Sequence, residues 1–418
     1  MIGRLARLGL ACALFLGVAC PAPAQAPSAY RGLYAALDAR LARFDRQLDA
    51  RPAAATPVLF AAELLTANGN RGKQLLRPET RVGVDLELDR LRGLGVQGVT
   101  VAIPFPLLYD PYWQEQGDAA ASRGMVEFYR WVAGEVHGRG MKLLVESGVM
   151  FPGVYSAGSE IDAKGYYRTL TDAQYVEGRA QNILAVARAA GPDVLNVGSE
   201  PDTEFRLTGK EFVRDPRAFA RMVRTFVDRA AAAGLGNVPL AAGTGTWYAP
   251  GASYVAELCK IGGLAAIDLH LYPINRDYLD NALAFAQEGH ACGKRVTMLE
   301  TWLEKIADDE LGSTDATIDP AVFARDASSF WAPLDRRFLS VMAKYARTAG
   351  VDTLSAFWSR YFFAYLDPGL VARAGATQVL TWASAAAAQA MVDGRSTDTG
   401  ESYQAIITGG ATAGPPGR

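Results

Sequence analysis

The feature that most constrains the fold of this chain is a regular alternation of short apolar runs with helical stretches. The runs are rich in β-forming residues, and each ends near Gly, Pro, Asn or an aromatic residue before a helical pattern begins. The eight runs are 57–65, 96–104, 142–149, 194–199, 238–243, 266–272, 295–300 and 353–358. Nearly continuous apolar strands that alternate with helices are typical of a parallel sheet covered by helices. Eight such units predict a closed α/β barrel rather than an open sheet.

An open, doubly wound sheet is the alternative, but no Gly-rich phosphate loop of the G-x-G-x-x-G or Walker type follows the first run. We therefore predict a (β/α)8 TIM barrel over residues 57–394. Residues 27–56 are expected to form an extra N-terminal helix and a linker, because apolar residues recur there at three- and four-residue spacing. Residues 395–418 are rich in Gly, Thr and Ala and are expected to form a flexible tail.

The first 26 residues have the order of a secretory signal peptide. Two arginines precede the apolar run 8–18, and Ala-Gln-Ala at 24–26 is a small-x-small cleavage site. The apolar run is too short to cross a bilayer comfortably, so we predict no integral membrane span. A buried N-terminal helix is the alternative. Cys20 ends a lipobox-like string, but Gly17 replaces the usual bulky aliphatic residue, so a lipoprotein is less favoured than a periplasmic or secreted protein.

Removal of this segment leaves two cysteines, Cys259 and Cys292. An exported protein meets oxidising conditions, so the pair is a candidate disulfide. Each cysteine lies near the C-terminal end of an expected helix, and the two helices are consecutive, which places both near the same rim of the barrel. Two buried free thiols are an equal alternative, because sequence does not supply the geometry that a disulfide needs.

The charge balance and the scarcity of histidine exclude several classes of function. The chain has 42 basic and 44 acidic residues, so nothing in its charge favours nucleic acid as a partner. It has only three histidines, and only His270 lies in an apolar run, so a histidine-rich metal centre is not expected. We predict no cofactor and no metal.

Acidic residues end two of the apolar runs on opposite sides of the expected barrel. Glu200 follows the fourth run directly, and Glu300 ends the seventh. Catalytic groups in such barrels lie at the C-terminal ends of the strands. An acid at the end of an apolar run is costly unless it is solvated or paired. Two carboxylates, one protonated and one ionised, are the minimum machinery for hydrolysing a glycosidic bond.

Side-chain alternation predicts which residues face the interior of the barrel. The polar face of the sixth run includes His270 and Tyr272 and is expected to face inward. On the seventh run the same rule groups Glu300 with Val296 and Met298.

The chain resembles glycoside hydrolase clan A, a superfamily of barrels with catalytic glutamates on strands four and seven. The resemblance covers residues 57–393. It is carried by the motifs Val-Gly-Ser199-Glu200-Pro, His270-Leu-Tyr272-Pro, Met-Leu-Glu300-Thr-Trp302 and Phe-Trp358.

This resemblance implies a role for each matching residue. Glu200 would be the general acid/base and Glu300 the nucleophile, so hydrolysis would retain the anomeric configuration, which requires carboxylates about 5 Å apart. His270 or Tyr272 would orient Glu300. Trp358 would form the platform under the reacting sugar.

One departure from the clan pattern affects the expected activity. The clan usually has Asn directly before the acid/base, where it binds the sugar 2-hydroxyl, and this chain has Ser199. The change weakens the expected stabilisation of the transition state. A non-catalytic carbohydrate-binding barrel is therefore one alternative, and a polysaccharide lyase on the same scaffold is another.

Further residues at the strand ends are candidates for contact with a sugar. Aromatic rings stack on the apolar faces of sugars, although ordinary core packing also uses them. The expected stacking residues are Trp113, Trp247, Trp302 and Trp358.

The remaining strand-end acids allow other interpretations. Glu146 and Asp268 are interpreted as partners of other polar side chains, whereas Glu63 could contact the substrate. Glu200 could instead be a structural acid paired with Arg206 or Arg360. The sequence thus predicts an exported glycoside hydrolase that acts on a β-linked oligo- or polysaccharide.

Overall fold

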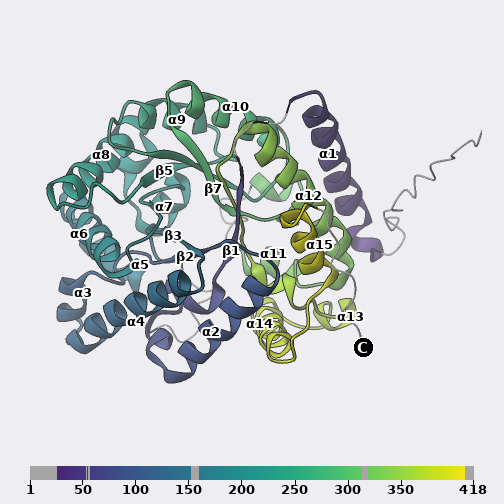
Figure 1. The fold of residues 1–418 in the computed structure, drawn as a ribbon, viewed down its shortest axis with the longest axis horizontal. Helices are drawn as coiled ribbons and strands as arrows, with labels where there is room; N and C mark the ends of the chain where they lie inside the picture. The colour runs from purple at the N-terminus through teal and green to yellow at the C-terminus, as the bar shows by residue number, and fades with distance from the viewer. Residues whose placement is uncertain (1–25, 53, 55–56, 152–159, 313–318, 410–418) are drawn as a thin grey trace, which may run out of the picture.

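The computed structural model describes residues 26–52, 54, 57–151, 160–312 and 319–409. Within these residues, eight parallel strands follow one another around a closed barrel, and β8 pairs with β1 to close it (Figure 1). The strands are β1 Leu59–Glu63, β2 Gly98–Ala102, β3 Lys142–Glu146, β4 Val194–Asn196, β5 Leu240–Gly245, β6 Ala266–Leu271, β7 Arg295–Thr301 and β8 Thr353–Ala356. The predicted (β/α)8 barrel is therefore confirmed.

Helices cover the outside of this barrel (Figure 1). The helices of the described residues up to β6 are α1 Arg31–Asp49, α2 Pro78–Gly93, α3 Asp110–Glu115, α4 Ala119–Gly138, α5 Ala163–Thr169, α6 Asp172–Ala190, α7 Pro201–Thr208, α8 Pro216–Ala232 and α9 Gly251–Cys259. Those after β6 are α10 Tyr278–Ala291, α11 Pro320–Arg325, α12 Ala332–Ala349, α13 Pro368–Val371, α14 Ala376–Val392 and α15 Asp398–Ile407. Local sequence explains where several of them begin. Thr171 and Gln174 form a capping box at α6, and Asp215 caps α8 ahead of Pro216.

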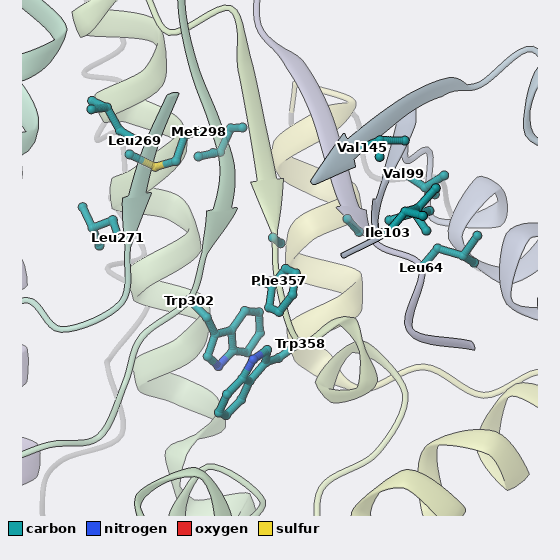
Figure 2. Packing of buried hydrophobic residues seen from close by; sticks show 14 of the residues in the cluster. Leu64, Val99, Ile103, Val145, Leu269, Leu271, Met298, Trp302, Phe357 and Trp358 are labelled. Carbon is teal, nitrogen blue, oxygen red and sulfur yellow. The ribbon is translucent and has the colours of Figure 1, made fainter. Parts of the chain in front are cut away.

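The strands separate a small inner apolar layer from a large outer one, because successive side chains point to opposite faces. The inner cluster comprises Ala61, Leu144, Val194, Ala241, Ala266 and Leu299. The outer faces belong to the main core shared with the helices, and Figure 2 shows Val99, Val145, Leu269 and Met298 among its members.

Strand β7 corrects the expected grouping of Glu300 with Val296 and Met298. Both of these apolar residues lie in the outer core, whereas the Thr297 hydroxyl donates a 2.7 Å hydrogen bond to Asp268 inside the barrel. The register of β7 shifts against both neighbouring strands in the segment just after Met298. Such a bulge inserts one extra residue into a strand, and here it returns Glu300 to the interior face.

The expected N-terminal helix is present as α1, and it packs beside α12 (Figure 1). Its apolar face buries Leu37, Leu41 and Phe44 completely. The Lys344 Nζ atom on α12 lies 2.6 Å from Asp45 Oδ1 on α1. This helix therefore belongs to the same packed body as the barrel.

Helix α15 corrects the expectation of a flexible tail after residue 394. It packs beside α12 and buries Thr399 and Tyr403 completely. The Tyr403 hydroxyl donates a 2.7 Å hydrogen bond to the carbonyl of Ala61 on β1, and Thr397 caps the helix. The composition of this segment gave the wrong prediction, because a capped helix with one buried aromatic residue is enough to hold an otherwise polar segment in place. Residues 410–418 lie outside the described part of the chain.

A disulfide joins Cys259, the last residue of α9, to Cys292, which follows α10; their Cα atoms are 5.8 Å apart. This confirms the pairing over the alternative of free thiols. No helix in the described ranges is long and apolar enough to cross a bilayer. The expected signal peptide, with Cys20, lies outside those ranges apart from Ala26, so it stays a prediction.

Candidate functional site

A cavity opens at the C-terminal ends of the strands. Its wall includes the carboxylate residues Glu146, Glu200, Glu204, Glu300 and Glu304. The structure thus brings the two expected catalytic glutamates to one cavity.

Glu200 reaches the cavity because β4 is short and gives way directly to a helix. The strand ends at Asn196, and Glu200 is the N-cap residue of α7, followed by Pro201 at the first helical position. Proline fits there because the first helical N–H needs no partner within the helix. The turn leaves the Glu200 side chain 19% exposed at the cavity wall.

His270 on β6 lies at the centre of a buried cluster of carboxylates. Its Nδ1 atom lies 2.8 Å from Glu200 Oε1 and 3.5 Å from Glu300 Oε2. Its Nε2 atom lies 3.1 Å from Asp268 Oδ2 and 3.4 Å from Glu146 Oε1. Asp268 is fixed in turn by Asn196, whose amide donates to it at 2.5 Å. One imidazole therefore contacts four acids, which supports the inward face predicted for β6.

Glu300 is held by the residue two positions beyond His270. The Tyr272 hydroxyl donates a 2.5 Å hydrogen bond to Glu300 Oε2. Oxygens of Glu200 and Glu300 and a nitrogen of His270 all lie within 4.8 Å of one another. Retaining glycosidases hold their carboxyl groups about 5 Å apart, whereas inverting ones need roughly 6.5–9.5 Å. The two carboxyl groups therefore lie close together in this cavity.

The hydrogen bonds and charges around His270 shift the pKa values of the two glutamates in opposite directions. Burial raises the pKa of Glu200, but the hydrogen bond and positive charge of His270 outweigh burial, so this pKa lies below its ordinary value. Burial raises the pKa of Glu300 well above its ordinary value; His270 opposes this shift, and the charges of Glu146 and Glu200 add to it. In the free protein, this environment therefore favours protonation of Glu300 over protonation of Glu200.

His270 itself is favoured in its charged form. Burial lowers the pKa of His270, but the surrounding charges of Glu300 and Glu146 raise it well above its ordinary value. The imidazolium therefore offsets part of the negative charge that the barrel end gathers.

Two groups in this cluster have the donor atoms to hold a metal ion. They are Glu146, Asp268 and His270, and Glu200, His270 and Glu300. Both groups share His270, whose two nitrogens already face carboxylates. The close carboxylates therefore fit a protonated imidazole as well as they would fit a metal.

The four tryptophans that were expected to stack on a sugar divide into two pairs. Trp247 and Trp358 line the cavity. Trp358 has a left-handed backbone with φ of 59°, and its backbone N–H donates a 3.0 Å hydrogen bond to Glu63 Oε2. Glu63 is thus a buried support for Trp358, and it does not belong to the cavity wall.

Trp113 and Trp302 correct the expectation that all four tryptophans contact sugar. Each is only 1% exposed, and neither lines the cavity. The Trp113 indole donates to the carbonyl of Leu107, and Trp302 packs against Tyr361 and Phe362. Both residues therefore stabilise the core beneath the loops. Their positions next to strand ends did not predict how deeply the two side chains are buried.

Sequence reasoning missed two further features of the wall. Phe323, from α11, packs edge-on against Trp358 with ring centroids 4.9 Å apart, and Glu304 lies four residues beyond Glu300. Both come from the long segment after β7, where alternation gives no guide to direction. Arg206 Nη2 lies 3.6 Å from Asp202 Oδ2, and the charge of Arg206 also lowers the pKa of Glu200.

Comparison with known proteins identifies the fold. No protein-family model matches the sequence, and no curated protein matches it. Among solved structures, XEG5B, a GH5 xyloglucan-specific β-1,4-glucanase from a ruminal metagenomic library, aligns with a TM-score of 0.50 at 11% identity. The alignment covers 85% of this chain and 93% of that one.

The chain shares its (β/α)8 barrel fold with this glucanase.

Two further structures with this fold are similar. Op5Man5, an exo-β-1,4-mannosidase from Opitutaceae bacterium strain TAV5, aligns at 15% identity and a TM-score of 0.48 over 82% of this chain. The alignment spans only 62% of the length of Op5Man5. BoMan26A, a GH26 β-mannanase from Bacteroides ovatus, aligns at 15% identity and a TM-score of 0.42, over 83% of this chain and 92% of that one.

Proposed function

We propose that this protein is an exported glycoside hydrolase that cleaves a β-linked glycan with retention of configuration. The observation that carries the proposal is the close pair Glu200 and Glu300, which have carboxylate oxygens within 4.8 Å of each other at the mouth of a (β/α)8 barrel. A close pair of this kind fits direct attack by one carboxylate better than attack by a water held between two distant ones.

The proposed reaction has two steps. Glu300 attacks the anomeric carbon while Glu200 protonates the departing glycosidic oxygen, which yields a covalent glycosyl-enzyme. Glu200 then takes a proton from water, and this water breaks the ester to Glu300. The Tyr272 hydrogen bond stabilises the ionised form of Glu300, which both the attack and the final departure require.

This assignment of roles requires a proton to change places when the substrate binds. In the free protein the electrostatics favour a proton on Glu300, whereas the reaction begins with the proton on Glu200. His270 Nδ1 contacts both carboxylates, so it can exchange its hydrogen bond between them as the charge moves. Binding of the sugar must therefore lower the pKa of Glu300 relative to that of Glu200.

Trp247 and Trp358 are proposed to hold the sugar rings, since both are aromatic and line the cavity. Ser199, which also lines the cavity, replaces the usual amide beside the acid/base. Its shorter side chain reaches less far toward the sugar.

The first prediction concerns activity itself. The form 27–418 is expected to release reducing sugar from a member of a panel of β-glycans and aryl β-glycosides. Glu200→Gln and Glu300→Gln are each expected to lower kcat by at least about a thousandfold, because each removes a group that bonds to or protonates the reacting atoms.

Azide separates the roles of the two glutamates. With an aryl glycoside, Glu200→Ala with azide should give a β-glycosyl azide, and Glu300→Ala should give the α product. Exchanged outcomes would reverse the roles. Sugar binding without any product would favour the non-catalytic barrel, and an unsaturated product absorbing in the ultraviolet would favour a lyase.

Export is part of the proposal. It is supported by the charged, apolar and small-residue order of residues 1–26 and by the Cys259–Cys292 disulfide, which oxidising compartments favour. The N-terminal sequence of the protein recovered from a periplasmic or culture fraction should begin at Ala26 or Pro27. A lipid on Cys20 would instead leave the protein in the membrane fraction.

A further inference from the structure

The cavity wall carries a third buried carboxylate that the proposed hydrolysis does not use. Glu146, at the end of β3, is 6% exposed. Its Oε2 atom lies 3.4 Å from the Ser199 hydroxyl, and its Oε1 atom lies 3.4 Å from His270. Glu146 therefore stands beside the position from which the clan usually contacts the substituent at C2 of the reacting sugar.

One oxygen of a fourth carboxylate in the wall lacks a hydrogen-bond partner among the described residues. Glu304 is 3% exposed, and its Oε2 atom has no hydrogen-bond partner among the described residues. Burying a carboxylate without compensation is costly. The negative charges of Asp326 and Glu200 add to the effect of burial and raise the pKa of Glu304 to about 8, although the charges of Arg206 and Lys305 oppose this shift. A ligand that brings a positive charge would remove this cost.

The described wall of the cavity offers almost no positive charge of its own. Its lining includes neither lysine nor arginine, and His270 is its single base. Glu204 is already neutralised by Arg179 at 2.7 Å. Glu146 shares the positive charge of His270 with three other acids. The proposed chemistry uses neither Glu146 nor Glu304.

We propose that the substrate is a glycan of amino sugars with free, positively charged amino groups. Glu146 binds the ammonium group at C2 of the reacting sugar, and Glu304 binds an ammonium group on a neighbouring sugar. The inference rests on the proposed hydrolase activity and adds its substrate class. A neutral 2-hydroxyl or an N-acetyl group would bring no positive charge to either carboxylate.

An ammonium group at this place also explains how binding prepares the nucleophile. The charge of Glu146 contributes to the raised pKa of Glu300. A cation beside Glu146 cancels that contribution, so the pKa of Glu300 falls and its ionised form is favoured. A neutral sugar has no such effect.

The test compares glycans that differ only at C2. Hydrolysis by the form 27–418 is measured on β-1,4 oligomers of glucosamine, of N-acetylglucosamine and of glucose. Neutral β-mannan, β-galactan, xylan and β-1,3-glucan are measured beside them, and a β-1,6-linked glucosamine polymer is measured before and after deacetylation. We expect cleavage of the deacetylated substrates at a kcat/KM at least about tenfold above that of their acetylated and neutral counterparts.

The results separate failure of this inference from failure of the proposed function. Preferred cleavage of a neutral or acetylated glycan overturns the amino-sugar inference and leaves the hydrolase standing. No cleavage of any glycan overturns the hydrolase and, with it, this inference.

Variants test the two carboxylates directly. Glu146→Gln and Glu304→Gln keep side-chain size and are each expected to raise KM for the glucosamine oligomer about ten- to a hundredfold, as loss of a charged hydrogen bond does. Glu177→Gln removes the same charge from exposed α6 and should leave KM unchanged. An unchanged KM in both cavity variants, with native thermal stability, would overturn the assignment.

Discussion

The hydroxyl of Tyr272 acts on the carboxylate that must be ionised for attack. It donates to Glu300 Oε2 at 2.5 Å, and burial together with nearby negative charge raises the pKa of the same carboxyl. The hydrogen bond therefore works against the rest of the environment. Because it stabilises the ionised form, its loss should affect the reaction more than the fold.

Tyr272→Phe is expected to lower kcat/KM about ten- to a hundredfold, since a hydrogen bond to a charged group contributes about 1.5–3 kcal/mol. The acidic limb of the pH–rate profile should move to higher pH, because the pKa of Glu300 rises further. Tyr345→Phe is the control: its hydroxyl bonds the Ala282 carbonyl in the helix layer, so it should cost stability and leave kcat/KM unchanged. An unmoved pH profile in Tyr272→Phe would contradict this role.

At the scale of elements, α15 covers the outside of the barrel where β8 pairs with β1. Tyr403 stacks on Phe362 with ring centroids 5.0 Å apart and bonds the Ala61 carbonyl. Phe362 belongs to the short helix Ser359–Phe362, which directly follows Trp358. The helix thus supports the segment that presents a cavity tryptophan.

Tyr403→Ala is expected to lower the free energy of unfolding by about 3–5 kcal/mol, as removal of a fully buried aromatic side chain does. Urea denaturation of the variant measures this loss. Thr408→Ala, at the exposed end of α15, should change stability by less than about 0.5 kcal/mol. A loss below about 1 kcal/mol in Tyr403→Ala would mean that the helix is not part of the cooperative unit.

Across the whole molecule, several buried acids have raised pKa values. Burial raises the pKa of Glu63 to about 7, of Glu146 to about 6 and of Asp326 to about 7. Asp326 shares the buried Lys305 with Asp335, at 3.1 and 2.5 Å.

These acids predict how stability depends on pH. A carboxyl whose pKa is raised on folding contributes stability that is fully present below about 4.5 and is lost as the pH rises through the folded value. For Glu63, a shift from 4.5 to about 7 corresponds to about 3 kcal/mol. We therefore expect Tm to fall between about pH 5 and pH 8, as calorimetry can measure. A flat or rising Tm over this range would contradict the shifts.

The sequence by itself determined the barrel, the N-terminal helix and the two strand-end glutamates. These follow from period and position, since apolar alternation fixes strand and helix order and a strand end fixes which rim a side chain reaches. The pairing of Cys259 with Cys292 was open in the sequence and was decided by geometry.

Tertiary structure alone decided the features that depend on register, depth and distant partners. The bulge in β7 turned Glu300 inward although simple alternation grouped it with Val296 and Met298, which face outward. The side chains of Trp113 and Trp302 are buried in the core. Helix α15 packs on a surface that exists only once the barrel has closed. The proton balance of Glu200 and Glu300 likewise arises from His270 and Glu146, which other strands bring within a few ångströms. Local sequence does not encode such contacts, because they join residues that are far apart in the chain.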